Sequence, residues 1–306
     1  MKLSRDAMAT RFELVVHGSE KARLRAAGEE ALEEIVRVER QLNRFSSQSE
    51  VSGVNARAAH KAVRVDPRLF SLIQTAQDIY RRTDGAFDIT VAPLMRAWKL
   101  TEGGTVPDRD ILDSARALVG MHHVRMYQES LSVRFDAPGV ELDLGGIGKG
   151  YSIDRAVDLL RDAGVTVCLL HGGTSAVYAC GAPDYNPWRV SIRNPDKEGE
   201  SLGYLCLKDS ALSVSAAHGR SFCRDGQEFG HIIDPRTGMP TQTARLAAVT
   251  GPSAMMCDAL STALLVLGTD WLPELANRFS GYGGLVVRAA DDKARIAARG
   301  IALIEG

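Results

Sequence analysis

The order of the hydrophobic patterns along the chain constrains its fold more than any other feature. Helical stripes of apolar residues dominate the first half, one running from 32 to 42 and a second from 69 to 80. Asp66 is a favourable N-cap for the second helix, and Pro67 suits its first turn. The turn residues at 83–85 end that helix. The first half is therefore predicted to be mainly helical.

Short strand patterns crowd the middle of the chain, separated by Gly, Pro, Asn or Asp. Strands are predicted over 11–17, 165–170, 175–180, 188–192, 204–207, 212–215, 246–250 and 284–288, and further helices over 152–163 and 254–267. Strands and helices occur in runs rather than in strict βαβ alternation. This order predicts an α+β fold.

The composition excludes several classes of protein. The 306 residues are 45% apolar and 25% charged, enough to bury a large core, and the formal charge of -1 provides no overall field for nucleic acid or anionic membrane. Five widely spaced cysteines favour buried free thiols over a disulfide framework. We expect no membrane insertion, since no apolar stretch is long enough to span a bilayer. Without a signal peptide or lipid-bearing cysteine, the sequence as it stands predicts a cytoplasmic protein; the alternative is a periplasmic or membrane-anchored one whose leader was trimmed.

The glycine-rich segment Asp143–Gly150 lies between a predicted strand at 140–144 and the helix at 152–163. Its backbone amides and the helix N-terminus can hold an anion. It matches neither common nucleotide-binding pattern, because Gly150 follows Lys149 where a P-loop has Ser or Thr, and no G-x-G-x-x-G can be drawn. The alternative is a tight strand-to-helix turn without a ligand.

Three oxygen-bearing residues share one face of the helix predicted over 254–267. Asp258 and Thr262 are four residues apart, and Ser261 lies beside them. One carboxylate and two hydroxyls are hard ligands of the kind that Mg²⁺ uses. The alternative is a polar pair on a mostly buried helix.

Two other segments combine polar residues with turn signals. His231 begins a strand-like stretch that leads into the turn Asp234–Gly238. The histidine is either structural or, if it faces a metal-containing cleft, an acid, base or substrate ligand. The stretch 83–90 is either a helix-ending turn with a short strand or part of a binding site.

Five segments, in this order, resemble the FAD:protein FMN transferase (ApbE) family: Met8–Phe12, Asp84–Val91, Asp143–Gly150, His231–Gly238 and Asp258–Thr262. The resemblance covers nearly the whole chain. It implies a single ApbE-like domain over 1–306, with mixed and antiparallel sheets packed with helices and an FAD cleft between two lobes. It also implies Mg²⁺-dependent cleavage of FAD, transfer of FMN to a Thr or Ser hydroxyl of a target flavoprotein, and release of AMP.

The resemblance also implies roles for single residues. The contacts to FAD would come from Met8, Phe45, Ala86, Phe87, Asp88, Asp143, Lys149 and Ile233. The metal ligands would be Asp258, Thr262, the main-chain oxygen of Gly146 and Ser261. His231 and Asp258 are the catalytic candidates, with His231 deprotonating the acceptor hydroxyl or orienting the phosphate.

Three positions depart from the pattern of some family members. Gly146 offers only a carbonyl where others have Thr or Ala, Ser261 has a hydroxyl where some have an acidic residue, and Phe45 keeps an aromatic ring where others have Tyr. Two alternative functions use the same site. One is an FAD pyrophosphatase that releases FMN and AMP, and the other is a non-catalytic FAD-binding protein.

Overall fold

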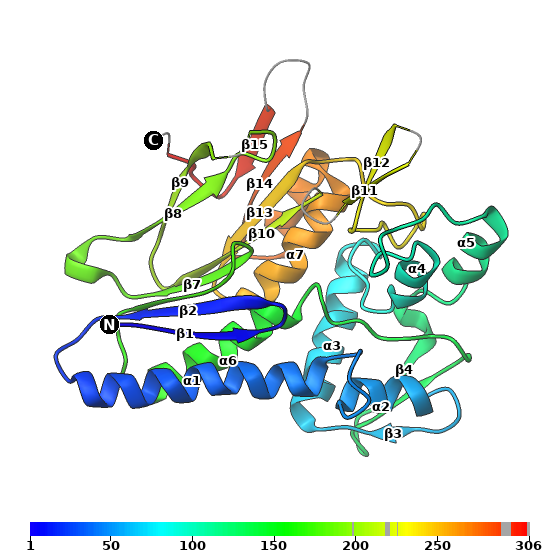
Figure 1. Ribbon diagram of the computed structural model, residues 1–306, viewed down its shortest axis with the longest axis horizontal. Coiled ribbons are helices and arrows are strands. Elements are labelled where there is room, and N and C mark those ends of the chain that lie inside the picture. Colours follow the sequence, from blue (N-terminus) through cyan, green and yellow to red (C-terminus); the bar gives the residue numbers. More distant parts are fainter. Residues whose placement is uncertain (198, 218–220, 225, 289–294, 305–306) are drawn as a thin grey trace. The chain divides into compact units, whose positions relative to one another are not determined.

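The computed structural model describes all residues except 198, 218–220, 225, 289–294 and 305–306 (Figure 1). The chain divides into two compact units, each built from separated stretches. Unit 1 comprises Met1–Glu39, Ile147–Ala216 and Ala244–Gly306, and unit 2 comprises Arg40–Gly146 and Ala217–Thr243. Helices and antiparallel sheets occur together, so the α+β class is confirmed. The single domain over 1–306 stays a prediction.

Unit 1 is built on an eight-stranded antiparallel sheet with the order β1-β2-β6-β7-β10-β13-β14-β15. The strands are β1 (Lys2–Ala7), β2 (Thr10–Val16), β6 (Cys168–Gly172), β7 (Ala176–Cys180), β10 (Ser210–Ala216), β13 (Leu246–Gly251), β14 (Gly283–Arg288) and β15 (Arg295–Arg299). A separate antiparallel pair is formed by β8 (Trp188–Arg193) and β9 (Ser201–Leu207). The helices are α1 (Lys21–Leu42, whose last turn belongs to unit 2), α6 (Gly148–Asp162), α7 (Ala254–Leu267) and α8 (Leu272–Arg278), with short 3-10 turns at Pro183–Tyr185 and Thr269–Trp271.

Strand β10 shows how the two faces of this sheet are used. Side chains alternate between the faces along a strand. Leu212 is buried in an apolar cluster with Leu205 and Leu207 of β9. Its neighbour Ser213 points to the other face, where its hydroxyl meets Asp258 of α7. The sheet is thus covered by β8–β9 on one face and by α7 on the other (Figure 1).

Unit 2 combines helices with two small sheets. Its helices are α2 (Glu50–Arg57), α3 (Pro67–Arg82), α4 (Ala92–Ala97) and α5 (Arg109–Arg116), with a 3-10 turn at Met121–His123. One antiparallel sheet has the order β3-β5-β4, with β3 (Val63–Arg64), β4 (Val124–Tyr127) and β5 (Ser132–Phe135); β11 (Ser221–Arg224) pairs with β12 (Gln227–Gly230). The start of α3 is confirmed, because the Asp66 carboxylate accepts a hydrogen bond from the amide of Arg68, 2.8 Å away.

The predicted strand at 140–144 is wrong, and the hydrogen bonds of Leu142 explain why. Its amide donates to Oδ1 of Asn55 and its carbonyl accepts from Nδ2 of Asn55, at 2.9 and 3.0 Å. A side-chain amide thus takes the place of a neighbouring strand. The helix predicted from 152 begins earlier, at Gly148, so Lys149 lies in its first turn.

Other predicted elements also differ from the structure. The strand predicted from 165 begins at Cys168, because the amide of Val165 still bonds to the carbonyl of Leu160 at the end of α6. The stretch 86–90 forms turns and bends instead of a strand. At 231–233 only one bridge forms, between Ile233 and Pro240.

Two further predictions concerned the cysteines and membrane insertion. All five cysteines are free, as predicted, but Cys206 and Cys223 are exposed instead of buried. Each helix in the described part of the chain falls short of the length or apolarity that crossing a bilayer requires.

Candidate functional site

The carboxylate of Asp258 lies at the centre of the polar face of α7 in unit 1. The residue is 4% exposed. Oδ2 accepts a hydrogen bond from the amide of Gly150 at 3.0 Å, and Oδ1 accepts one from the hydroxyl of Ser213 at 3.2 Å. Burial raises the pKa of this carboxyl, whereas Lys149, the amide and the hydroxyl lower it. The protein thus keeps a buried carboxylate beside the start of α6.

Hydroxyl groups surround this carboxylate. Ser261 and Thr262 both donate to the carbonyl of Asp258, at 3.0 and 3.2 Å, so both side chains fold back onto the helix. Ser213 and Ser215 of β10 reach the same place, where Oγ of Ser215 lies 2.8 Å from Oγ of Ser261. Sequence reasoning missed both serines, although their alternation along a strand is the signal that could have found them.

The donor set around Asp258 consists of oxygen atoms alone. Among the described residues no three His, Cys, Asp or Glu side chains cluster in a way that could hold a metal. A single carboxylate with hydroxyls suits Mg²⁺, which uses one or two protein carboxylates and retains water and phosphate ligands. The oxygen atoms around Asp258 are therefore of the type that can bind Mg²⁺.

Helices α6 and α7 are joined by reciprocal hydrogen bonds from carboxylate to amide. While Asp258 of α7 binds the amide of Gly150 in α6, Asp154 of α6 accepts bonds from the amides of Ala254 and Met255, at 2.7 and 2.9 Å. Asp154 also accepts a 2.6 Å bond from Ser253, the N-cap of α7. The crossing is tight, since a Cβ at Gly150 would lie 2.1 Å from the carbonyl oxygen of Ala254. Sequence reasoning missed Asp154, because its partners lie about a hundred residues away.

The glycine segment 143–150 divides between the two units after Gly146. In unit 2 the amide of Gly145 donates to Oδ1 of Asp143 at 2.7 Å. In unit 1 the amide of Gly150 donates to Asp258. The sequence predicted that amides of this segment bind an external anion. Two of these amides instead donate to carboxylates of the protein itself.

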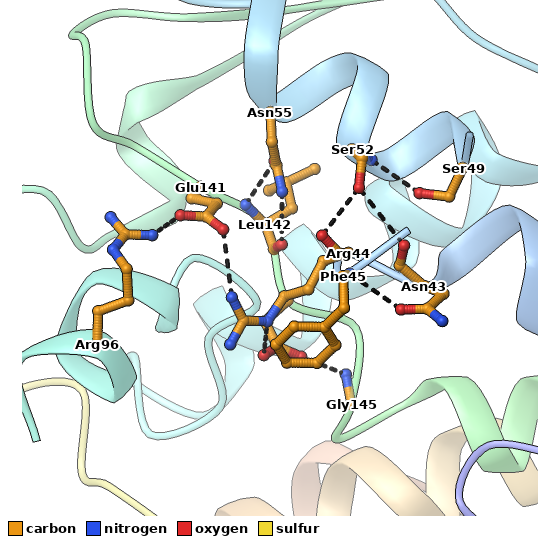
Figure 2. Close-up of polar contacts among 11 residues, drawn as sticks. Asn43, Arg44, Phe45, Ser49, Ser52, Asn55, Arg96, Glu141, Leu142 and Gly145 are labelled. Carbon is orange, nitrogen blue, oxygen red and sulfur yellow. Dashed lines mark hydrogen bonds and ion pairs between the residues drawn. The ribbon is translucent and has the colours of Figure 1, made fainter. Parts of the chain in front are cut away.

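Asp143 belongs to a charged cluster in unit 2, of which Figure 2 labels Arg44, Arg96 and Glu141. Nε of Arg44 lies 2.6 Å from Oδ2 of Asp143, and Nη1 of Arg44 lies 3.2 Å from Oε1 of Glu141. Arg96 pairs with the other oxygen of Glu141. The ring of Phe45 lies against Arg44, and the residue is 71% exposed. Two arginines therefore neutralise two carboxylates beside an exposed aromatic ring.

The predicted binding stretch 86–88 is buried and lies next to Asp143 in unit 2. The amide of Asp143 donates to the carbonyl of Ile89 at 2.6 Å. Ala86 and Phe87 are 1% and 3% exposed, and Asp88 is 6% exposed. Asp88 accepts two hydrogen bonds from Thr90, at 2.7 and 2.6 Å, yet burial raises its pKa to about 6.

His231 and Ile233 lie on a hairpin-like segment of unit 2. His231 is half-buried. Ile233 is 5% exposed and packs in an apolar cluster with Leu94 and Trp98. The indole of Trp98 donates to the carbonyl of Gly238 at 2.8 Å, which fixes the turn that follows. The side chain of Ile233 thus contributes to the core.

Met8 occupies the turn between β1 and β2 in unit 1. Met8 and Ala9 have positive φ angles of 50° and 56°, which are costly for residues other than glycine and cluster at functional sites. The amide of Met8 donates to Glu39 at 2.6 Å. Of the predicted residues, unit 1 holds Met8, Lys149, Asp258, Ser261 and Thr262, and unit 2 holds Phe45, Ala86, Phe87, Asp88, Asp143, Gly146, His231 and Ile233.

Comparison with known proteins finds a matching family model and similar proteins of known name. The chain matches the ApbE family model over residues 8–285. It is 28% identical over 288 residues to an FAD:protein FMN transferase of Klebsiella pneumoniae, covering 92% of this chain and 81% of that protein. A protein of the same name from Rhodobacter capsulatus is 34% identical over 248 residues, and the match covers 79% of this chain and 46% of that protein.

Two solved structures share the fold almost throughout. The ApbE protein of Thermotoga maritima has a TM-score of 0.89 and 30% identity, covering 98% of this chain and 97% of that chain. The flavin transferase ApbE of Vibrio cholerae has a TM-score of 0.82 and 25% identity, with the same coverage.

Proposed function

The chain belongs to the ApbE family, and from that premise we propose that it is an FAD:protein FMN transferase. The proposed reaction cleaves the pyrophosphate of FAD, transfers FMN to a Thr or Ser hydroxyl of a target flavoprotein and releases AMP. The proposal is supported by two relatives described above, each of which is named an FAD:protein FMN transferase. In this chain the observation that carries the proposal is a buried carboxylate, Asp258, surrounded by hydroxyl oxygens.

We assign Asp258 and Thr262 to Mg²⁺, with Ser261 as a further ligand and the carbonyl of Gly146 as predicted from the sequence. When bound, Mg²⁺ supplies positive charge that stabilises the oxyanions of phosphoryl transfer. The residues around Asp258 orient its carboxylate, because Gly150 and Ser213 each hold one of its oxygens.

The other predicted residues bind or orient the substrates. Lys149, in the first turn of α6, adds positive charge for a phosphate. Phe45 offers a flat apolar face to a ring of FAD. Met8, Ala86, Phe87, Asp88, Asp143 and Ile233 supply the remaining contacts, through the main chain where the side chain is in the core. His231 is the proposed base for the acceptor hydroxyl.

The decisive experiment measures the mass of an acceptor protein. Purified protein is incubated with FAD, Mg²⁺ and a flavoprotein that carries an acceptor Thr. The acceptor should gain the mass of FMN as AMP is released, and a Thr→Val acceptor should gain none. Release of FMN and AMP without any adduct would instead identify an FAD pyrophosphatase. FAD recovered intact would identify a binding protein.

The role of His231 has its own test. His231→Ala should lower the rate of FMN transfer at saturating FAD while the affinity for FAD stays within about twofold, since a base acts on the acceptor and not on FAD binding. A normal transfer rate in this variant would make the histidine structural.

A further inference from the structure

Phe45 presents a large apolar ring on a loop whose backbone is hydrogen-bonded. It lies in the loop between α1 and α2, and 71% of the residue is exposed. Its amide donates to Oδ1 of Asn43 at 2.9 Å, and the hydroxyl of Ser52 donates to the carbonyl of Arg44 at 2.8 Å (Figure 2). Ser49 caps α2 immediately after this loop. The loop holds the ring outward at a fixed place instead of burying it.

One side of this ring is covered by the guanidinium of Arg44. Cζ of Arg44 lies 4.3 Å from the centre of the Phe45 ring, within the range of a cation–π contact. The Arg44 side chain is only 9% exposed, whereas Phe45 is 71% exposed. The exposed area therefore belongs to the opposite side and the edges of the ring, which remain open to a flat ligand.

The guanidinium is in turn held by two carboxylates on one stretch of chain. Glu141 and Asp143 flank Leu142 and reach Arg44 at 3.2 and 2.6 Å. Both carboxylates therefore face the same guanidinium. Asn55 holds both the amide and the carbonyl of Leu142 (Figure 2). Asn55 thus holds the stretch of chain whose two carboxylates bind Arg44.

We propose that Arg44 is a positioning residue that holds the ring of Phe45 as a stacking platform for a flat ring of FAD. The inference rests on the proposed function. A guanidinium is suited to this task because it is planar, so it can bind carboxylates through its edge while its face lies on a ring. Arg44 also binds Asp143, another predicted FAD contact, and so links two parts of the binding surface.

The test is a double-mutant cycle between Arg44 and Phe45. Arg44→Met keeps a long apolar side chain but removes the charged plane. It should raise the Kd for FAD, measured by equilibrium dialysis, and the KM for FAD about fivefold. The kcat for FMN transfer should stay within about twofold, because stacking that is equal in the ground and transition states affects KM alone. In a Phe45→Leu background the same change should raise Kd and KM less than twofold.

The cycle separates positioning from a general structural role. Equal effects of Arg44→Met with and without the Phe45 ring would overturn the proposal, as would an unchanged Kd in the single variant. Arg44→Lys keeps the charge near Asp143 but loses the plane, and we expect a two- to threefold rise in Kd. A lysine variant equal to the wild type would show that a point charge is enough and would also overturn the proposal.

Arg96→Met is the matched control, since Arg96 pairs with the same Glu141 and has a 51% exposed side chain. It should leave the Kd for FAD within twofold, and a rise equal to that of Arg44→Met would assign the effect to the carboxylate pairing instead. Wild-type protein that binds FAD without transferring FMN would refute only the proposed function. Wild-type protein that does not bind FAD would refute both.

Discussion

Asp258 of unit 1 and Asp143 of unit 2 each accept a hydrogen bond from an amide of the same glycine segment, but their surroundings differ. Asp258 lies on a helix, is 4% exposed and is hydrogen-bonded by an amide and a hydroxyl. Asp143 lies on irregular chain and has its charge paired with Arg44 at 2.6 Å. The hydrogen-bond partners of Asp258 are uncharged, whereas Arg44 neutralises the charge of Asp143. A carboxylate with uncharged partners is therefore better suited to act as a cation ligand than one that is paired with an arginine.

Replacing these two carboxylates one at a time should change the rate of FMN transfer by very different factors. Asp258→Asn keeps the shape and an acceptor for Gly150 but removes the charge, so FMN transfer should fall at least about 100-fold, as expected for loss of a metal ligand. Asp143→Asn should lower it less than about tenfold. Both rates are measured as FMN adduct formed over a range of Mg²⁺ concentrations. Equal losses, or full activity of Asp258→Asn, would contradict the assignment of Asp258 as a metal ligand.

A second prediction concerns the packing that holds Asp258 in place. In Gly150→Ala the new Cβ would lie 2.1 Å from the carbonyl oxygen of Ala254, which is main chain and cannot rotate away. Forcing α6 and α7 apart should lower the free energy of unfolding by about 3 kcal/mol. Urea unfolding followed by circular dichroism measures the loss.

Gly53→Ala in unit 2 is the control for this packing effect. Its Cβ would meet only the end of the flexible Arg57 side chain, at 2.9 Å. Because alanine favours a helix more than glycine does, this variant should be about 0.5 kcal/mol more stable than the wild type. If both alanines were tolerated equally, the crossing of α6 and α7 would not be as tight as the contact at Gly150 indicates.

The sequence predicted much of this molecule where the signals are local. Helix α7 begins and ends at the predicted residues, and Asp66 caps α3 as expected. These elements depend on apolar spacing and on capping groups within a few residues. The three oxygen-bearing residues of α7 were identified for the same reason, since their spacing on one helix face is visible in the chain.

The partners that complete these groups could not be predicted, because they come from distant parts of the chain. Ser213 reaches Asp258 across 45 positions, and Asn55 replaces a strand beside Leu142 across 87 positions. Arg44 stands next to Phe45 in sequence, yet its carboxylate partners are nearly a hundred residues away. Such contacts depend on tertiary packing, and no local propensity encodes them.

Asp88 shows whether the pKa of a carboxyl group depends on its burial or on the unit in which it lies. It lies in unit 2, like Asp143, but is 6% exposed, like Asp258. Burial raises its pKa to about 6, although hydrogen bonds from Thr90 oppose this. The folded protein thus holds this proton more tightly than the unfolded chain, whose Asp pKa is near 4. The cost of ionising Asp88 is absent below about pH 4, grows between about pH 4 and 6, and is complete above that range.

Asp88→Asn should therefore stabilise the protein at alkaline pH. The amide oxygen can still accept both bonds from Thr90, and no charge has to be buried. We expect the variant to exceed the wild type by about 1–3 kcal/mol at pH 8, and the difference to disappear toward pH 4. Urea unfolding at several pH values measures it. A constant difference across this range would show that Asp88 is ionised at no cost and that burial does not set its behaviour.

At the exposed residue Phe45 of unit 2, one added atom should be tolerated. Phe45→Tyr adds a single oxygen to the ring of a residue that is 71% exposed, whereas Gly150→Ala adds a single carbon against main chain. The ring keeps its face and its contact with Arg44, so the KM for FAD should change less than about twofold, with unfolding free energy within about 0.5 kcal/mol of the wild type. Steady-state FMN transfer and urea unfolding measure both. A KM changed tenfold in either direction would mean that the edge of the ring, and not only its face, contacts FAD. The surroundings of Phe45 would then tolerate an added atom as poorly as the crossing of α6 and α7 does.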